Sequence, residues 1–300
     1  GSGRATDQVP RQTPVPAIAP VWNRVTTASV PGVAHSELAG CTLARFTSFD
    51  GESIPYFTYL PGGGSTASAR PFPTVFLIHG GPEAQSRPAF NNVVQFLVAG
   101  GFAVIVPNIR GSAGYGRRYL DLDNREKRLD SIRDIAELAR HLAANDDAID
   151  GERLAVAGGS YGGFAVLSAL TEHPELWRAG VDIVGISNFV TFLENTAPWR
   201  RALRESEYGS LADRELLERI SPINRIERIT APLLIIQGDN DERVPLSESV
   251  QMYDRLRELG RTVELMRFAD EGHGVTRLAN RIAAYTRVAQ WLRQHLKATR

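Results

Sequence analysis

The sequence is poor in the residues that stabilise small or metal-dependent folds. Its 300 residues include one cysteine, Cys41, which has no partner for a disulfide within the chain. Cysteine and histidine residues nowhere show the spacing of a zinc site, so we expect neither a metal nor a cofactor. The stability of the fold must therefore come from the packing of a hydrophobic core.

Long apolar runs and a surplus of one charge are also missing. No stretch reaches the roughly 18 apolar residues of a membrane-spanning helix, and the N-terminus lacks the basic and apolar segments of a signal peptide. Lys+Arg and Asp+Glu both number 34, whereas nucleic-acid binders usually carry a basic surface. We therefore expect a cytoplasmic protein with no membrane or nucleic-acid partner. The composition is compatible with a homo-oligomer.

The first 40 residues differ in character from the rest of the chain. Gly1-Ser2-Gly3 resembles the remnant of a purification tag, and a proline-rich stretch without hydrophobic periodicity follows. We interpret residues 1–40 as an extension. Residues 41–300 are long enough for one large α/β domain, and we expect them to form it.

Short apolar runs alternate with amphipathic segments from residue 41 onward. The first two runs flank Asp50-Gly51, a dipeptide typical of β-hairpins, and several later runs are almost continuously apolar, as buried parallel strands are. Strands are predicted at 43–49, 54–60, 73–79, 102–107, 154–157, 180–184, 232–237 and 263–268, and helices at 131–144, 164–170, 246–259 and 282–296. This order indicates an α/β fold in which helices cover both faces of a mostly parallel central sheet.

Residues 188–223 interrupt the alternation with several short helical segments after a strand. We interpret them as a short helical cap inserted at the carboxyl edge of the sheet. Ligands of open α/β sheets bind at that edge.

A candidate nucleophile follows the strand that ends near Ala157. Residues 158–163 read Gly-Gly-Ser-Tyr-Gly-Gly and contain GxSxG between a strand and a helix, which places Ser160 on a tight turn with its hydroxyl exposed. The alternative is an ordinary serine in a glycine-rich turn. A phosphate-binding loop is disfavoured because no lysine follows the glycines.

Serine needs a base to remove its proton and a carboxylate to orient that base. His273 is the best candidate base because it lies in a loop after the last predicted strand, between Gly272 and Gly274. Two aspartates follow the strand 232–237. Asp239 has the position of a turn residue, whereas Asp241 lies deeper in the loop and is favoured as the acid; each could also be an ordinary loop carboxylate.

Acyl transfer also requires donors for an oxyanion. In a fold of this kind one donor is the amide after the nucleophile, here Tyr161 N–H, and the other comes from the loop after an earlier strand. Gly81 N–H in the segment His79-Gly80-Gly81-Pro82 fits the second position. The alternative for this segment is a plain tight turn.

Together these motifs resemble those of the prolyl oligopeptidase family of serine peptidases, especially its acylaminoacyl-peptidase-like members. The resemblance extends over about residues 46–296. It rests on Phe49-Asp50-Gly51, the HGGP segment 79–82, the NxRGxxGYG segment 108–116, the GGSYGG segment 158–163, the DxRVP segment 241–245 and the DEGHG segment 270–274. GxSxG alone would indicate only the α/β-hydrolase fold, and NxRGxxGYG together with DxRVP is more specific.

The resemblance implies an α/β-hydrolase fold with Ser160 as nucleophile, Asp241 as acid and His273 as base. It also implies that Arg243 holds a carbonyl of the substrate backbone, for which the alternative is a surface salt bridge. Arg110 is expected to be structural. Relatives usually carry an N-terminal β-propeller, and residues 1–40 are too short to form one.

Three aromatic residues in the cap segment, Phe189, Phe192 and Trp199, are candidates for an apolar substrate pocket, although aromatics at helical spacing often belong to the core. The leading hypothesis is a serine hydrolase that cleaves peptide or acyl-amino-acid bonds of small peptides through an acyl-enzyme. A carboxylesterase or thioesterase that acts on a small metabolite is the near alternative. A non-catalytic binding domain is the third, and the complete set of motifs disfavours it.

Overall fold

A computed structural model of the chain describes residues 23, 25, 32–62 and 70–297. The chain divides into two units, residues 1–35 and 36–300, and the description below concerns the second. Most of the predicted extension, including the tag-like Gly1-Ser2-Gly3, lies outside the described residues.

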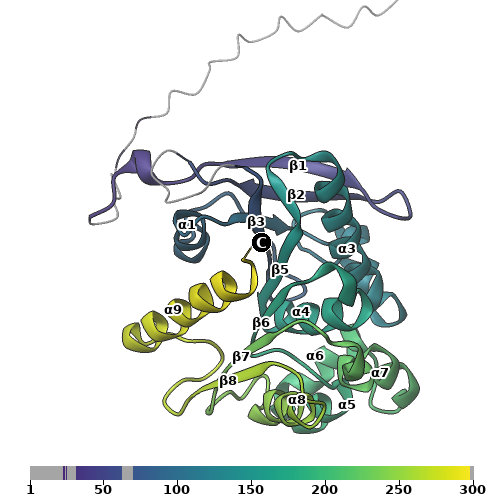
Figure 1. Cartoon of the computed structure of the whole chain (residues 1–300). Helices are drawn as coiled ribbons and strands as arrows, with labels where there is room; N and C mark the ends of the chain where they lie inside the picture. The colour runs from purple at the N-terminus through teal and green to yellow at the C-terminus, as the bar shows by residue number, and fades with distance from the viewer. Residues whose placement is uncertain (1–22, 24, 26–31, 63–69, 298–300) are drawn as a thin grey trace, which may run out of the picture. The chain divides into compact units, whose positions relative to one another are not determined.

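Eight strands of the described residues form one mixed sheet (Figure 1). They are β1 (Cys41–Thr47), β2 (Ser53–Tyr59), β3 (Phe72–Ile78), β4 (Ala103–Pro107), β5 (Ile149–Gly159), β6 (Ala179–Ile183), β7 (Leu233–Gly238) and β8 (Val263–Phe268). Their order is β1-β2-β4-β3-β5-β6-β7-β8, antiparallel from β1 to β4 and parallel from there on. The predicted mostly parallel sheet is therefore confirmed.

The hairpin between β1 and β2 turns where the sequence predicts it. Gly51 has a φ of 88°, which favours glycine, and its N–H donates to the carbonyl of Ser48 at 3.0 Å. The central strands are buried, as their continuous apolar runs predict: every residue of β4 and of β7 is buried. β5 begins at Ile149, five residues earlier than the sequence analysis placed it.

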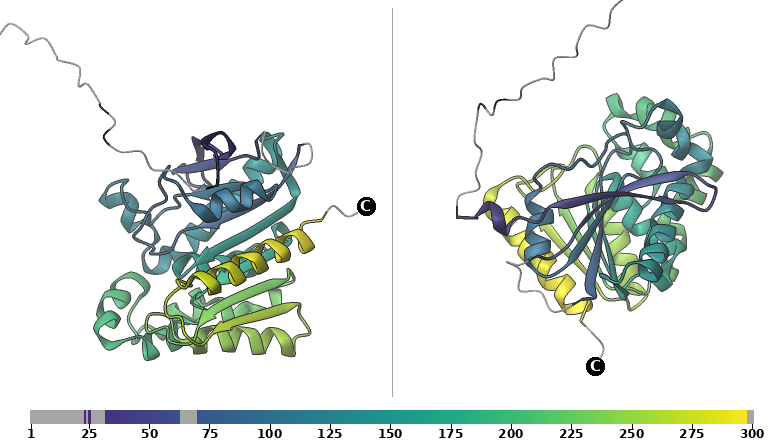
Figure 2. Two further views of the ribbon diagram at one scale, coloured as in Figure 1. Left: turned by 90° about the vertical axis from the view of Figure 1, so that its left-hand side faces the viewer. Right: turned by 90° about the horizontal axis from the view of Figure 1, so that it is seen from above.

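Helices cover both faces of the sheet (Figures 1 and 2). On one face, α1 (Asn92–Ala99) and α9 (Leu278–His295) enclose a core cluster with the sheet. On the other face, α3 (Arg128–Asn145), α4 (Tyr161–Glu172) and α8 (Leu246–Glu258) enclose a second, larger cluster. The remaining short helices are α2 (Arg117–Leu120), η1 (His35–Glu37), η2 (Asp121–Asp123), η3 (Arg125–Lys127) and η4 (Pro174–Leu176).

The predicted cap is helical. It consists of α5 (Phe189–Asn195), α6 (Pro198–Tyr208), α7 (Arg214–Ile220) and η5 (Pro222–Arg228), which lie between β6 and β7 in the chain. A buried carboxylate ties its start to the domain: Glu248 of α8 accepts the N–H groups of Ser187 and Asn188 at 3.1 and 2.8 Å. The cap therefore begins at a defined position beside the carboxyl ends of the strands.

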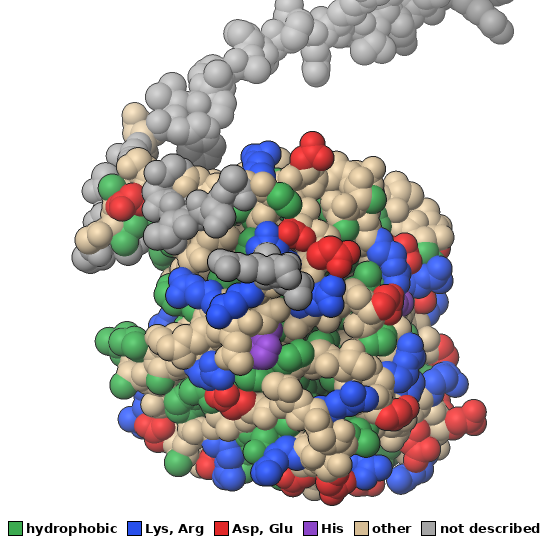
Figure 3. All heavy atoms as spheres, in the orientation of Figure 1, with side chains coloured by type: hydrophobic (Ala, Val, Ile, Leu, Met, Phe, Trp, Pro, Cys, Tyr) green, Lys and Arg blue, Asp and Glu red, His purple; other side chains and the backbone are tan. Residues whose placement is uncertain are grey.

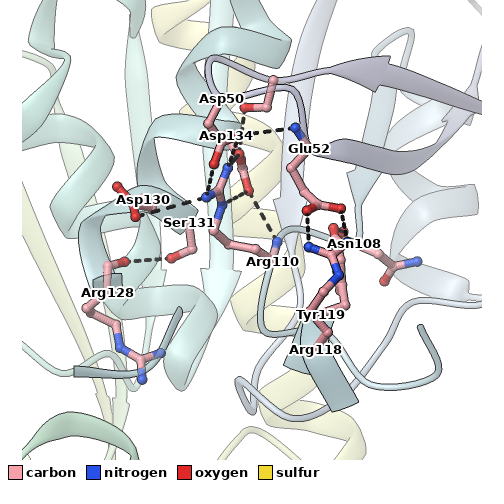
Figure 4. Close-up of polar contacts among 11 residues, drawn as sticks. Asp50, Glu52, Asn108, Arg110, Arg118, Tyr119, Arg128, Asp130, Ser131 and Asp134 are labelled. Carbon is pink, nitrogen blue, oxygen red and sulfur yellow. Dashed lines mark hydrogen bonds and ion pairs between the residues drawn. The ribbon is translucent and has the colours of Figure 1, made fainter. Parts of the chain in front are cut away.

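Arg110 joins the glycine-rich loop of residues 108–116 to the β1–β2 hairpin and to α3 (Figure 4). Its guanidinium, 2% exposed, donates to Asp134 at 2.7 and 2.8 Å and to Asp50 at 2.8 and 3.1 Å. Hydrogen bonds from Arg110 lower the pKa of the Asp50 carboxyl, against the opposing effect of burial. The expected structural role of Arg110 is confirmed.

The surface drawn in Figure 3 mixes side chains of both charges, in line with the equal numbers of basic and acidic residues. Within the described ranges, no helix is long and apolar enough to cross a membrane.

Candidate active site

Ser160 lies on a sharp turn between β5 and α4. Its φ of 59° and ψ of −119° put a non-glycine residue in a sparsely populated region, at a cost of about 1–3 kcal/mol. The Ser160 N–H donates to the carbonyl of Ile183 at 2.8 Å, and the Ser160 carbonyl accepts the N–H of Phe164 at 3.0 Å. The side chain is half-buried and caps no N–H group of α4, so its hydroxyl is not used to stabilise the start of the helix.

Close backbone contacts explain the small residues around Ser160. A Cβ atom on Gly158 would lie 2.4 Å from the carbonyl oxygen of Gly162, and one on Gly162 would lie 2.3 Å from the carbonyl oxygen of Ile78. Both distances are too short for carbon and oxygen. The helix begins at Tyr161, directly after Ser160, which is three residues earlier than the sequence pattern predicts.

Asp241 is the aspartate that lies against His273. The Nδ1 atom of His273 and the Oδ2 atom of Asp241 are 2.8 Å apart. The other carboxylate oxygen accepts the N–H groups of Arg243 at 2.8 Å and Val244 at 3.0 Å, so the loop fixes the carboxylate. Because an ionised carboxylate only accepts hydrogen bonds, this contact places the imidazole proton on Nδ1 and leaves the lone pair of Nε2 free.

Asp239, the alternative acid, has a different partner. Both of its carboxylate oxygens accept hydrogen bonds from the Arg267 guanidinium of β8, each at 2.9 Å. Its side chain is 24% exposed, whereas that of Asp241 is fully buried. The structure therefore brings Asp241, and not Asp239, to the histidine.

The loop that carries His273 is shaped by Glu271, which the sequence analysis did not single out. Glu271 is 2% exposed and accepts hydrogen bonds from the N–H and hydroxyl of Thr276, the N–H of Arg277 and the side-chain amide of Asn280, at 2.8–3.0 Å. Burial opposes ionisation, but these hydrogen bonds lower the pKa of Glu271 to about 2. Glu271 therefore holds the histidine loop as an anion at neutral pH.

The turn that carries Ser160 and the loop that carries His273 meet at one cavity of about 260 Å³. Gly158 and Gly159 line it from beside Ser160, and Gly274 and Val275 line it from beside His273. The loops after β5 and β8 thus converge at the carboxyl edge of the sheet, where ligands bind in this type of fold.

The two predicted oxyanion donors lie on segments that flank Ser160. A Cβ atom on Gly80 would lie 3.3 Å from the Cβ atom of Ser160, which places the loop of residues 79–82 directly against Ser160. Gly81 has a φ of 137°, and a Cβ atom there would lie 2.7 Å from the backbone nitrogen of Glu83. Tyr161 is the first residue of α4, where backbone N–H groups have no acceptor within the helix.

His79 has a structural position in the first glycine loop. Its Nδ1 donates to the Gly80 carbonyl at 2.8 Å, and its Nε2 lies 2.8 Å from the hydroxyl of Ser112 in the loop of residues 108–116. Burial lowers the pKa of His79, which favours the neutral ring. His79 therefore joins two loops of the site.

Arg243 presents an exposed side chain two residues after Asp241. Its N–H donates to Asp241, and its carbonyl accepts the hydroxyl of Thr196 at the end of α5, at 3.0 Å. No salt bridge to it is formed by any residue in the described part of the chain. The backbone of Arg243 is thus fixed between the loop of Asp241 and the cap, while its guanidinium forms no ion pair with a described residue.

The three candidate pocket aromatics do not share one surface. Phe189 and Phe192 are at most 1% exposed and pack with Tyr208 and with each other, as core residues do. Trp199 is 72% exposed, on α6. Their contact with substrate stays a prediction.

Two further polar residues near the site, Arg204 and Glu207 of α6, gave no sequence signal because charged residues at helical spacing usually form a solvated face. Here both are largely buried and paired at 2.6 Å. Burial raises the pKa of Glu207 to about 7, against the opposing effect of Arg204 and Arg128.

No three His, Cys, Asp or Glu side chains in the described residues form a group that could hold a metal ion.

Comparison with protein families gives one match along most of the chain: the prolyl oligopeptidase family model fits residues 88–299. The chain is 36% identical to dipeptidyl aminopeptidase BIII of Pseudoxanthomonas mexicana over 219 residues, which are 70% of this chain and 31% of that protein. It is 28% identical to the acylamino-acid-releasing enzyme of Homo sapiens over 242 residues, which are 78% of this chain and 33% of that enzyme. The chain thus spans about a third of the length of these curated relatives.

Among solved structures, the fold is similar to that of a puromycin-hydrolyzing peptidase of Mycobacterium tuberculosis. The TM-score is 0.84 at 25% sequence identity, and the match covers 89% of this chain and 41% of that chain. The α/β-hydrolase fold expected from the sequence is therefore confirmed.

Proposed function

Because this chain belongs to the prolyl oligopeptidase family of serine peptidases, we propose that it hydrolyses peptide or acyl-amino-acid bonds of small peptides through a covalent acyl-enzyme. The proposed triad is Ser160, His273 and Asp241. The observation that carries this proposal is the 2.8 Å contact between His273 Nδ1 and Asp241 Oδ2, on loops that converge with the strained turn of Ser160.

In the acylation step, Ser160 Oγ attacks the scissile carbonyl while Nε2 of His273 takes the hydroxyl proton. Asp241 stabilises the imidazolium that forms. When the tetrahedral intermediate collapses, His273 gives the proton to the leaving amine and the acyl group stays on Ser160. In deacylation, a water molecule takes the place of the serine and the same proton transfers release the acid.

The negative charge that develops on the substrate oxygen requires preorganised donors. We assign this role to the N–H groups of Gly81 and Tyr161. The first belongs to the loop packed against Ser160, and the second to the N-terminus of α4, whose dipole favours an anion.

The proposal is tested by profiling the protein on acyl-amino-acid, aminoacyl and dipeptidyl anilides beside p-nitrophenyl esters. We expect turnover of at least one class of anilide and labelling by a fluorophosphonate, which reacts with base-activated serines. Ester turnover without anilide turnover would favour the carboxylesterase or thioesterase alternative. Absence of both turnover and labelling would favour a non-catalytic domain.

Arg243→Ala should reduce kcat/KM for a peptide anilide by roughly tenfold or more, because hydrogen bonds to a charged group contribute about 1.5–3 kcal/mol. Hydrolysis of p-nitrophenyl acetate should be nearly unchanged, since that substrate offers no second carbonyl to the guanidinium. Steady-state kinetics on both substrates check this. Arg214→Ala, on an exposed side chain of α7, is the control.

Equal losses on both substrates would mean that Arg243 supports the acid loop and does not hold substrate. No loss on either substrate would leave it a solvated surface residue.

A further inference from the structure

Behind the two proposed oxyanion donors lies a network of buried polar groups that the triad does not use. It starts at the phenol of Tyr161, which donates to Asp123 Oδ2 at 3.0 Å and lies 2.9 Å from the hydroxyl of Ser131. Asp123 pairs with Arg128 at the start of α3, and both side chains are at most 1% exposed. The donor segment that carries Tyr161 is thereby anchored to the large core.

From Arg128 the network continues into the cap. Arg128 donates to the carbonyl of Glu207 at 2.9 Å. The carboxylate of Glu207 accepts the Nη1 of Arg204 at 2.6 Å, and the same nitrogen donates to the carbonyl of Gly81 at 3.2 Å. Helix α6 thus reaches the second donor segment, and one bonded path joins Gly81 to Tyr161.

Aromatic rings surround this path. The guanidinium of Arg128 lies 5.2 Å from the ring of Tyr161 and 4.8 Å from that of Tyr208, and Arg204 lies 5.9 Å from Tyr208. The side chains of Arg204 and Glu207 are 13% and 4% exposed. Hydrogen bonds in such low-dielectric surroundings are stronger than at the surface, which makes the path stiff.

We propose that Arg204 and Glu207 are positioning residues that fix the backbone of Gly81 from its carbonyl side, so that the cap helix α6 helps to set the direction of the Gly81 N–H relative to that of Tyr161. The inference rests on the proposed function. Glycine has a wide choice of backbone angles, so the φ and ψ of Gly81 stay fixed only if the peptide groups on both sides of it are held. The Gly80–Gly81 peptide group, which carries the Gly81 N–H, is held where His79 Nδ1 donates to the Gly80 carbonyl, and the Gly81–Pro82 peptide group needs a contact of its own. The hydrogen bond from Arg204 to the Gly81 carbonyl is such a contact, and Glu207 holds Arg204 in place.

A purely structural ion pair between cap and domain would behave differently. Its loss would lower stability and loosen substrate binding, whereas a misplaced oxyanion donor lowers kcat and leaves KM in place, because the donor acts only on the charge that develops in the transition state.

The test measures kcat, KM, Tm and the rate of fluorophosphonate labelling for Arg204→Met and Arg204→Lys in the full chain. Arg204→Met should lower kcat and the labelling rate by about 10- to 100-fold, less than the 10²–10³-fold loss on removal of a donor itself. KM should change less than about twofold. Arg204→Lys should recover part of kcat, because an ammonium can still donate to the Gly81 carbonyl.

Arg201→Met is the matched control, because Arg201 lies on the same helix and donates to the carbonyl of Glu194 outside the network. It should leave all four quantities unchanged. Glu207→Gln, which keeps the shape of the side chain, should lower kcat in the same direction as Arg204→Met. The double variant should lose less than the product of the single losses, because both act through one path.

The inference would be overturned by an unchanged kcat in Arg204→Met, by equal losses in Arg201→Met, or by multiplicative losses in the double variant. In each of these cases, turnover by the unmutated protein would still support the proposed function. If the unmutated protein shows neither turnover nor labelling, the proposed function fails and the inference fails with it.

Discussion

Ser160→Ala is expected to lower kcat by about 10⁶-fold on every substrate that the protein hydrolyses, the size of loss seen when a triad serine is removed in other serine proteases. Without the hydroxyl no acyl-enzyme forms, and His273 has no proton to take. The same variant should lose fluorophosphonate labelling completely. Steady-state kinetics and labelling of the purified protein, followed by mass spectrometry of the labelled peptide, check both expectations.

Thermal unfolding shows whether the loss of activity comes from the missing hydroxyl or from a loss of folding. Alanine keeps the Cβ atom and the strained φ of 59°, so Tm should hardly change. Ser247→Ala, on an exposed serine of α8, is the matched control and should keep full activity and labelling. Labelling that survives in Ser160→Ala would remove the central claim of the proposed function.

The second large effect is expected for Asp241→Asn, which should lower kcat by about 10⁴-fold. In the substituted side chain, the amide oxygen would stay on the N–H groups of Arg243 and Val244, because these donors need an acceptor. The NH₂ group would then face Nδ1 of His273 and force the imidazole proton onto Nε2. That tautomer cannot accept the proton of Ser160.

Asp239→Asn is the control for this variant, since it removes one of the two hydrogen bonds with Arg267 at a partly exposed site. We expect less than about a threefold change in kcat, as for most surface substitutions. Kinetics of the two variants side by side, at a pH where the histidine is neutral, give the ranking. The reverse ranking would make Asp239 the acid.

Much of the fold could be predicted because its signals are local. The hairpin turn needs only Asp50-Gly51, and the eight apolar runs mark the strands, although β5 starts earlier than its most apolar part suggests. Element boundaries and the strand order depend on pairing between distant segments. The substrate pocket was the least accessible to prediction, because the aromatic pattern of Phe189 and Phe192 fits a core as well as a pocket, and both side chains are buried.

The setting of Ser160 could be predicted from the chain alone, because the close backbone contacts of its strained turn require glycine two positions before and two positions after the serine. Which aspartate contacts His273, and which cap residue reaches the loop of Gly81, depends on contacts between distant parts of the fold. Asp239 is taken up by Arg267, 28 positions away, and Gly81 is met by Arg204, 123 positions away. No local pattern predicts such pairings, because the partners lie far apart in the sequence and meet only when the loops and the cap pack together.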